Sequence, residues 1–95
     1  MISSFMRIVF SDHAWEDYLH WQAHSDGGKI LERVNMLIKA TRRDPFAGVG
    51  KPEGLRGDMS GWWSRRITDE HRMVYRVTGR SEAQQLEIAQ LRYHY

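Results

Sequence analysis

The spacing of hydrophobic residues predicts two helices in the first half of the chain. Between residues 29 and 43, apolar side chains recur every three or four positions, as along the buried face of a helix: Ile30, Leu31, Val34, Leu37 and Ile38. A similar spacing follows Ser11 and Asp12, which offer a typical N-cap, and it ends at the polar segment 25–28. The short glycine-containing joint between the two segments predicts a helical hairpin.

Shorter hydrophobic segments predict strands. Residues 6–10 are the first candidate and residues 86–93 the last. Between them, residues 61–75 predict a β-hairpin, in which the polar turn 68–70 separates two segments rich in aromatic, β-branched and long side chains. The resulting β-α-α-β-β-β order predicts an α+β fold, with two N-terminal helices packed on one face of a small antiparallel sheet.

Alternation within the hairpin divides its side chains between two faces. In the first arm Trp63, Arg65 and Ile67 alternate with Trp62, Ser64 and Arg66. In the second arm His71, Met73, Tyr75 and Val77 alternate with Arg72, Val74 and Arg76. Arginines therefore project from paired strands, where planar guanidinium groups are well placed to bind phosphate. The alternative is a solvated face whose charges prevent edge-to-edge pairing, and the hairpin alone favours that alternative.

Composition restricts the class of protein. A chain of 95 residues has room for one domain with one modest core. Its 41% hydrophobic and 27% charged residues are ordinary for a soluble globular protein, and no apolar segment approaches the length of a membrane span. The first six residues are too short for a secretory signal. Cysteine is absent, which excludes disulfides and thiolate chemistry, and we expect a cytoplasmic protein.

The charges favour a polyanionic partner. The chain has 14 Lys and Arg against 12 Asp and Glu, and eleven of the cations are arginine. Residues 12–26 are acidic, whereas residues 42–92 contain most of the arginines, so the fold can produce a one-sided basic surface. An acidic protein partner, or a codon bias toward arginine, would explain the same excess of arginine.

Two local motifs fail the tests for a nucleotide or metal site. Residues 48–51 (GVGK) lack the spacing of a phosphate-binding loop and the Ser or Thr that should follow the lysine. His20 and His24 stand four residues apart on the first predicted helix, but no third ligand accompanies them. We therefore expect no metal and no cofactor.

Residue types along the second half of the chain suit metal-free cleavage of RNA. Glu53 can accept the proton of a ribose 2′-hydroxyl, and His94 can protonate the departing 5′ oxygen. Arg65 or Arg66, together with Arg72, can stabilise charge on the phosphoryl oxygens. The terminal tyrosines Tyr93 and Tyr95 can stack on bases. Taken alone, Glu53 and His94 are better explained as exposed residues of a loop and a terminus.

Five segments closely resemble the YoeB toxins of the RelE/YoeB superfamily. They are residues 41–46 (TRRDPF), 50–53 (GKPE), 61–67 (GWWSRRI), 71–75 (HRMVY) and 92–95 (RYHY). The resemblance extends in order and register over residues 7–95. It implies a RelE-like microbial ribonuclease fold and a type II toxin that cleaves mRNA in the ribosomal A site.

The resemblance also implies roles for individual residues. Glu53 matches the general base and His94 the general acid. Arg72 matches the phosphate-stabilising arginine, Arg66 a further catalytic arginine, and Tyr95 an active-site tyrosine. The expected contacts with RNA or the ribosome are Lys51, Arg56, Arg65 and Tyr93; at Arg56 relatives can have lysine.

Further expectations concern partners and chain ends. The family implies a YefM-type antitoxin, the 70S ribosome with mRNA, operator DNA reached through the antitoxin complex, and a homodimer. Residues 1–95 are expected to form one domain. Residues 1–5 extend beyond the usual start, so Met6 is a candidate initiator. The alternative function is a binding module with the toxin fold that acts mainly in an antitoxin and operator complex.

Overall fold

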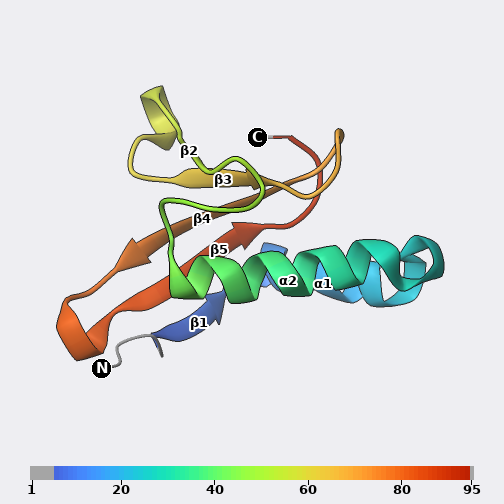
Figure 1. Ribbon diagram of the computed structural model, residues 1–95, viewed down its shortest axis with the longest axis horizontal. Coiled ribbons are helices and arrows are strands. Elements are labelled where there is room, and N and C mark those ends of the chain that lie inside the picture. Colours follow the sequence, from blue (N-terminus) through green and yellow to red (C-terminus); the bar gives the residue numbers. More distant parts are fainter. Residues whose placement is uncertain (1–5, 95) are drawn as a thin grey trace.

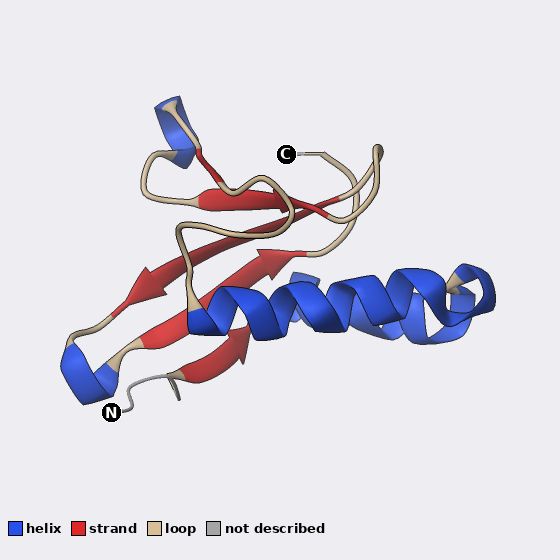
Figure 2. Cartoon of the chain, in the orientation of Figure 1, coloured by secondary structure: helices blue, strands red, loops and turns tan. Residues whose placement is uncertain are grey.

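The computed structural model describes residues 6–94, so the expected extension at residues 1–5 and the tyrosine at position 95 lie outside the described residues. A pair of helices lies against a five-stranded sheet (Figure 1; Figure 2). The elements are β1 (Arg7–Phe10), α1 (Asp12–His24), α2 (Lys29–Arg43), β2 (Glu53–Gly54), β3 (Trp63–Arg66), β4 (Arg72–Thr78) and β5 (Gln85–Gln90), with three-residue 3₁₀ turns at Asp26–Gly28, Gly57–Met59 and Ser81–Ala83. The predicted α+β class is confirmed.

Both predicted helices are confirmed, and local signals explain their ends. The Ser11 hydroxyl accepts a hydrogen bond from the Ala14 amide at 3.0 Å, which caps α1. Gly28 has a left-handed backbone (φ 82°) at the joint before α2. At the other end of α2, Pro45 disfavours helical geometry in the preceding residue, and the helix ends at Arg43.

The strands form one sheet in the order β1-β5-β4-β3-β2. Neighbours pair antiparallel except β1 and β5, which run parallel, so the expected antiparallel sheet is in fact mixed. No hairpin turn connects β1 to a neighbour, and the sequence therefore contains no local signal for its direction. Where β1 ends, Ser11 fixes the pairing, since its amide and hydroxyl donate to the Ile88 and Ala89 carbonyls.

Two strand boundaries differ from the prediction. The two-residue β2 contains Glu53, which we expected on a loop, and the strand is too short to show alternation. The last strand ends at Gln90 instead of residue 93. Residues 91–94, here called the C-terminal tail, leave the sheet.

The core lies between the helices and one face of the sheet. The apolar side of α2 contributes Val34, Leu37 and Ile38, and the sheet contributes Met73, Tyr75, Leu86 and Ile88. Ile30 and Leu31 are partly buried against this core. The cross-strand register confirms the predicted alternation, because Arg65 pairs with Met73 toward the core, and Arg66 pairs with Arg72 on the opposite face. The face away from the helices is thus left for polar chemistry.

Arg65 is the largest fully buried side chain of the described residues, which contradicts its expected role in binding RNA or the ribosome. Its guanidinium donates to the main-chain carbonyls of Asp44, Ala47 and Val49 and to the hydroxyl of Tyr75. Burial raises the pKa of Tyr75, although the Arg65 hydrogen bond opposes the rise. The Tyr75 hydroxyl in turn donates to the Pro45 carbonyl at 2.6 Å. Arg65 therefore holds the loop between α2 and β2 against the sheet.

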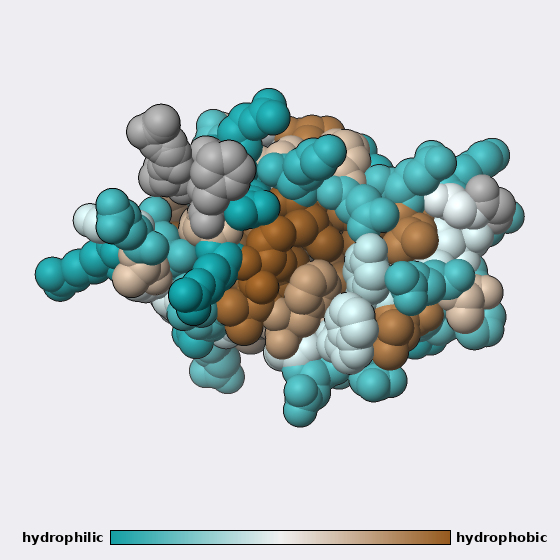
Figure 3. Space-filling model, turned by 90° about the horizontal axis from the view of Figure 1, so that it is seen from below, coloured by the Kyte–Doolittle hydropathy of each residue, from teal (hydrophilic) through white to brown (hydrophobic). Residues whose placement is uncertain are grey.

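Hydrophobic side chains also remain at the surface. Figure 3 shows them gathered on the side of the molecule seen from below in Figure 1, where β1 forms the free edge of the sheet. Exposed residues of β1 and α1 include Val9, Trp15 and Leu19. Within residues 6–94, no helix combines the length and apolar character needed to span a membrane.

Arg65→Met should lower the free energy of unfolding by about 3–5 kcal/mol, because three main-chain carbonyls and the Tyr75 hydroxyl lose a buried, charged donor. Chemical denaturation measures the change. Arg76→Met is the matched control. Arg76 pairs with Glu87 at 2.9 Å on the partly exposed face, and its loss should cost no more than about 1 kcal/mol. Equal effects for the two variants would contradict the structural role of Arg65.

Candidate active site

A cleft of about 390 Å³ lies on the side of the hairpin that faces away from the helices. Its walls are formed by Lys51, Pro52, Glu53, Ser64, Arg66, Arg72 and His94. Four of the five expected catalytic residues therefore meet there, although they come from β2, β3, β4 and the C-terminal tail. The fifth, Tyr95, lies outside the described residues.

The carboxylate side of the cleft is built by the edge of the sheet. Glu53 pairs with Ser64 of β3 in antiparallel register, and its side chain is exposed. Just before β2 the chain turns sharply, with left-handed backbone at Gly50 (φ 88°) and Lys51 (φ 53°). The Gly50 carbonyl accepts the Arg66 amide at 2.6 Å, which joins this turn to β3. The loop thus brings Lys51 and Glu53 to the same cleft.

Two arginines face each other across the hairpin. Arg66 and Arg72 are cross-strand partners, and like charges in that arrangement repel each other. Nearby acceptors offset part of the repulsion: an Arg72 nitrogen donates to the Thr68 carbonyl at 2.7 Å, and Arg66 lies 3.9 Å from the exposed Asp69 carboxylate. Two permanent cations on a paired scaffold favour an anion such as phosphate in the cleft.

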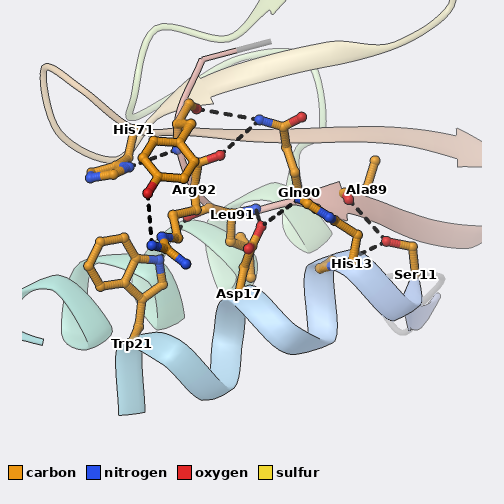
Figure 4. Close-up of polar contacts among 11 residues, drawn as sticks. Ser11, His13, Asp17, Trp21, His71, Ala89, Gln90, Leu91 and Arg92 are labelled. Atoms are coloured by element: carbon orange, nitrogen blue, oxygen red, sulfur yellow. Dashed lines mark hydrogen bonds and ion pairs between the residues drawn. The ribbon is translucent and has the colours of Figure 1, made fainter. Parts of the chain in front are cut away.

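Contacts with α1 fix the start of the C-terminal tail. The Asp17 carboxylate accepts the Leu91 amide at 2.9 Å, and the Trp21 indole donates to the Leu91 carbonyl at 2.8 Å (Figure 4). Both bonds are buried. They anchor the tail near its departure from the sheet and allow His94 to reach the cleft.

The remaining expected binding residues do not all reach the cleft. Lys51 lines it, whereas Arg65 is buried in the core. Arg56, at the start of the Gly57–Met59 turn, and Tyr93 are exposed but are not part of the lining. The Tyr93 ring lies against the Arg92 guanidinium and 5.5 Å from the His71 ring.

Sequence reasoning missed the residues that support the tail. Asp17, Trp21 and His71 contact residues between 22 and 74 positions away in the chain, and no local pattern indicates such pairs. Ser64 was placed on the correct face of the hairpin but was not assigned to the site. The structure also selects Arg66 over Arg65 as the second arginine of the cleft.

The cleft can hold an anion and transfer protons. It has a carboxylate and an imidazole for general base and acid roles, with guanidinium groups that can neutralise charge. Among residues 6–94, no group of three or more His, Asp or Glu side chains has a geometry that could hold a metal ion.

Comparison with known proteins finds relatives that match nearly the whole chain. A family model described as a YoeB-like toxin of bacterial type II toxin-antitoxin systems matches residues 10–95. Toxin YoeB of Streptomyces coelicolor is 59% identical over 90 residues, which cover 95% of this chain and all of that protein. Toxin YoeB of Escherichia coli K12 is 52% identical over the same length, with the same coverage.

Solved structures show the same fold. A YoeB/ParE toxin from Agrobacterium tumefaciens is 51% identical, with a TM-score of 0.86 over 95% of this chain and all of that one. A YoeB dimer from Staphylococcus aureus is 38% identical, with a TM-score of 0.79 over 95% of this chain and 98% of that one. A heterotetrameric YoeB–YefM complex from the same organism is 38% identical, with a TM-score of 0.78 over 96% and 99% of the two chains. This chain therefore belongs to the YoeB-like toxins of bacterial type II toxin–antitoxin systems.

Proposed function

We propose that the toxin is a ribosome-dependent endoribonuclease that cleaves mRNA in the ribosomal A site. The observation that carries the proposal is the meeting of Glu53, Arg66, Arg72 and His94 in one cleft. These side chains come from four separate elements, and each has the chemical type that cleavage of a ribose phosphodiester requires. Membership of the family supports the same function.

In the proposed reaction, Glu53 removes the proton from a ribose 2′-hydroxyl, and the resulting oxygen attacks the adjacent phosphorus. The bond from phosphorus to the 5′ oxygen breaks, and His94 donates a proton to that leaving oxygen. Arg72 and Arg66 stabilise the negative charge that develops on the phosphoryl oxygens. The products are a 2′,3′-cyclic phosphate and a 5′-hydroxyl. Because the attacking group is the 2′-hydroxyl, DNA is not a substrate.

Partners follow from the same proposal. We infer that a YefM-type antitoxin neutralises this toxin, as the YoeB–YefM complex from Staphylococcus aureus suggests, and that operator DNA is reached through that complex. The toxin acts in the cytoplasm as a homodimer, like the YoeB dimer of that organism. Val9, Trp15 and Leu19 supply exposed apolar surface for such a contact. Lys51 at the cleft, with exposed Arg56 and Tyr93, supplies contacts for mRNA or the ribosome, and Tyr95 completes the site.

A binding module that acts mainly with antitoxin and operator DNA is the second candidate. The YoeB–YefM heterotetramer favours it, because that structure contains toxin as a component of a larger assembly. Such a module needs a basic surface but has no use for Glu53 and His94 in the same cleft. Variants of these two residues therefore distinguish the candidates.

We expect primer extension on a translating mRNA to show cleavage by wild-type toxin only when ribosomes are present. Glu53→Gln removes the base and His94→Ala removes the acid, so each variant should lose at least about a hundredfold in cleavage rate. Glu82→Gln, which changes an exposed carboxylate in the Ser81–Ala83 turn, is the control and should cleave normally. Cleavage without ribosomes would mean a general ribonuclease. No cleavage by wild type would favour the binding module.

Arg72→Ala should reduce the cleavage rate by about 10²–10³-fold, or 3–4 kcal/mol, if this guanidinium stabilises the transition state. Single-turnover cleavage on saturating ribosome complexes measures the effect. The Arg72 side chain also supports the hairpin turn through the Thr68 carbonyl, so thermal unfolding must be recorded for the same sample. A folded variant with an almost unchanged rate would remove Arg72 from the chemistry.

A further inference from the structure

The C-terminal tail turns sharply one residue before His94. Tyr93 has a left-handed backbone (φ 66°), which is unfavourable for a residue with a side chain and persists only when its surroundings hold it. The turn also determines the direction in which the chain continues to His94. What holds Tyr93 therefore decides how His94 enters the cleft.

Both polar groups of the Tyr93 main chain form hydrogen bonds with consecutive residues where β4 begins: His71, just before the strand, and Arg72, its first residue. Its amide donates to the Nδ1 atom of His71 at 2.7 Å (Figure 4). Its carbonyl accepts the Arg72 amide at 3.0 Å. The Gln90 side-chain amide adds a longer bond, of 3.4 Å, to the same carbonyl. Of these three hydrogen bonds, the one to His71 joins the tail to a side chain of the hairpin.

The His71 ring is itself held in place. It packs edge-on against the Trp21 ring, with the centroids 4.9 Å apart and the planes at 79°. Trp21 is fixed in turn by its buried bond to the Leu91 carbonyl. The His71 main-chain carbonyl accepts the amides of Ile67 and Thr68, which ties the residue to the hairpin turn. The imidazole is thus a preorganised acceptor, positioned by α1 and the hairpin together.

We propose that His71 is a positioning residue for cleavage: its unprotonated Nδ1 holds the Tyr93 amide and thereby directs His94 into the cleft. The proposal rests on the proposed function, since it takes His94 to be the general acid. His71 does not line the cleft, and it acts on the reaction through the main chain of the tail.

This bond requires one form of the imidazole. Nδ1 can accept a hydrogen bond only when the ring proton is on Nε2, whereas in the imidazolium form both nitrogens are donors. Protonation of His71 would place an N–H group against the Tyr93 amide. Acid should therefore release the tail from His71.

The surroundings of His71 favour the accepting form. Burial is the largest influence and lowers the pKa of His71, and the cations Arg92 and Arg72 lower it further. Glu70 in the turn and Asp17 on α1 oppose this shift, and His20 also lies near from α1. Because the folded protein binds this proton less readily than the unfolded chain, the contribution to stability is complete above the ordinary histidine pKa of about 6.5. It declines as the pH falls below that value toward the folded pKa.

Two substitutions separate the acceptor from the bulk of the ring. In His71→Asn, the side-chain oxygen can replace Nδ1 as an acceptor, whereas His71→Leu fills similar space without one. We expect His71→Leu to reduce the single-turnover rate on saturating ribosome complexes tenfold or more, with little change in the ribosome concentration that gives half the maximal rate. His71→Asn should recover most of this loss. His20→Leu, which changes another histidine beside Trp21, should cleave at the wild-type rate.

Two further measurements test whether His71 acts through His94. In a His94→Ala background, His71→Leu should add little to the loss of rate, because the group that it positions is already absent. The rate of His71→Asn should fall less steeply than that of wild type between about pH 7 and 5, since an amide does not titrate there. The proposal would be overturned if the losses of rate caused by His71→Leu and His94→Ala were fully additive. It would also be overturned if the rates of wild type and His71→Asn fell equally steeply as the pH is lowered. A folded His71→Leu variant with the wild-type rate, or a His71→Asn variant no better than it, would have the same consequence.

Nitrogen NMR of the His71 ring tests the contact without any cleavage assay. We expect a neutral ring protonated at Nε2, and slow hydrogen exchange of the Tyr93 amide that becomes fast in His71→Leu but not in His71→Asn. A ring protonated at Nδ1 near neutral pH would overturn the proposal even if the toxin cleaves mRNA. Conversely, a wild-type protein that shows the expected ring and exchange but no cleavage would place the failure in the proposed function.

Discussion

The buried guanidinium of Arg65 is the interaction on which the arrangement of the site depends. Among residues 6–94 no carboxylate forms an ion pair with it, and it is held by the carbonyls of Asp44, Ala47 and Val49 and by the Tyr75 hydroxyl. A buried charge is stable only when its donors are satisfied, so the loop must adopt the conformation that supplies these oxygens. The same loop continues directly into Lys51 and Glu53. The core and the cleft are therefore joined by one side chain.

The hairpin gives its two faces opposite tasks. Arg65 and Arg66 are neighbours in sequence, yet one lies in the core and the other lines the cleft. A slip of one residue in the pairing of β3 would exchange the two arginines. It would also turn Ser64 toward the core and Trp63 away from it, so the hairpin would lose hydrophobic contact with the helices. The register that buries the hydrophobic face of the hairpin therefore also determines which of its residues line the cleft. The pairing of Arg66 with Arg72 is the functional consequence of a register that the core requires.

The sequence was sufficient for elements whose signal is local. The stripe on α2 and the alternation in the hairpin predicted the helices, the paired strands and the residues that share each face. Alternation also grouped Arg65 with Trp63 and Ile67, but the expectation that Arg65 contacts RNA or the ribosome did not use that signal. The direction of β1, the two-residue β2 and the end of β5 at Gln90 depend on partners distant in the chain. The hydrophobic periodicity within those segments gives no information about such distant partners.

The groups with the most demanding chemistry lie on the least regular parts of the chain. Arg66 and Arg72 stand on paired strands, whereas Glu53 is on a two-residue edge strand and His94 on a tail without strand pairing. Charge stabilisation tolerates small displacements, since it falls off gradually with distance, but proton transfer needs hydrogen-bond geometry. The fold meets this need with buried anchors outside the cleft: Arg65 holds the loop before Glu53, and Asp17 and Trp21 hold the tail before His94. The positions of Glu53 and His94 in the cleft are thus determined by residues that do not line it.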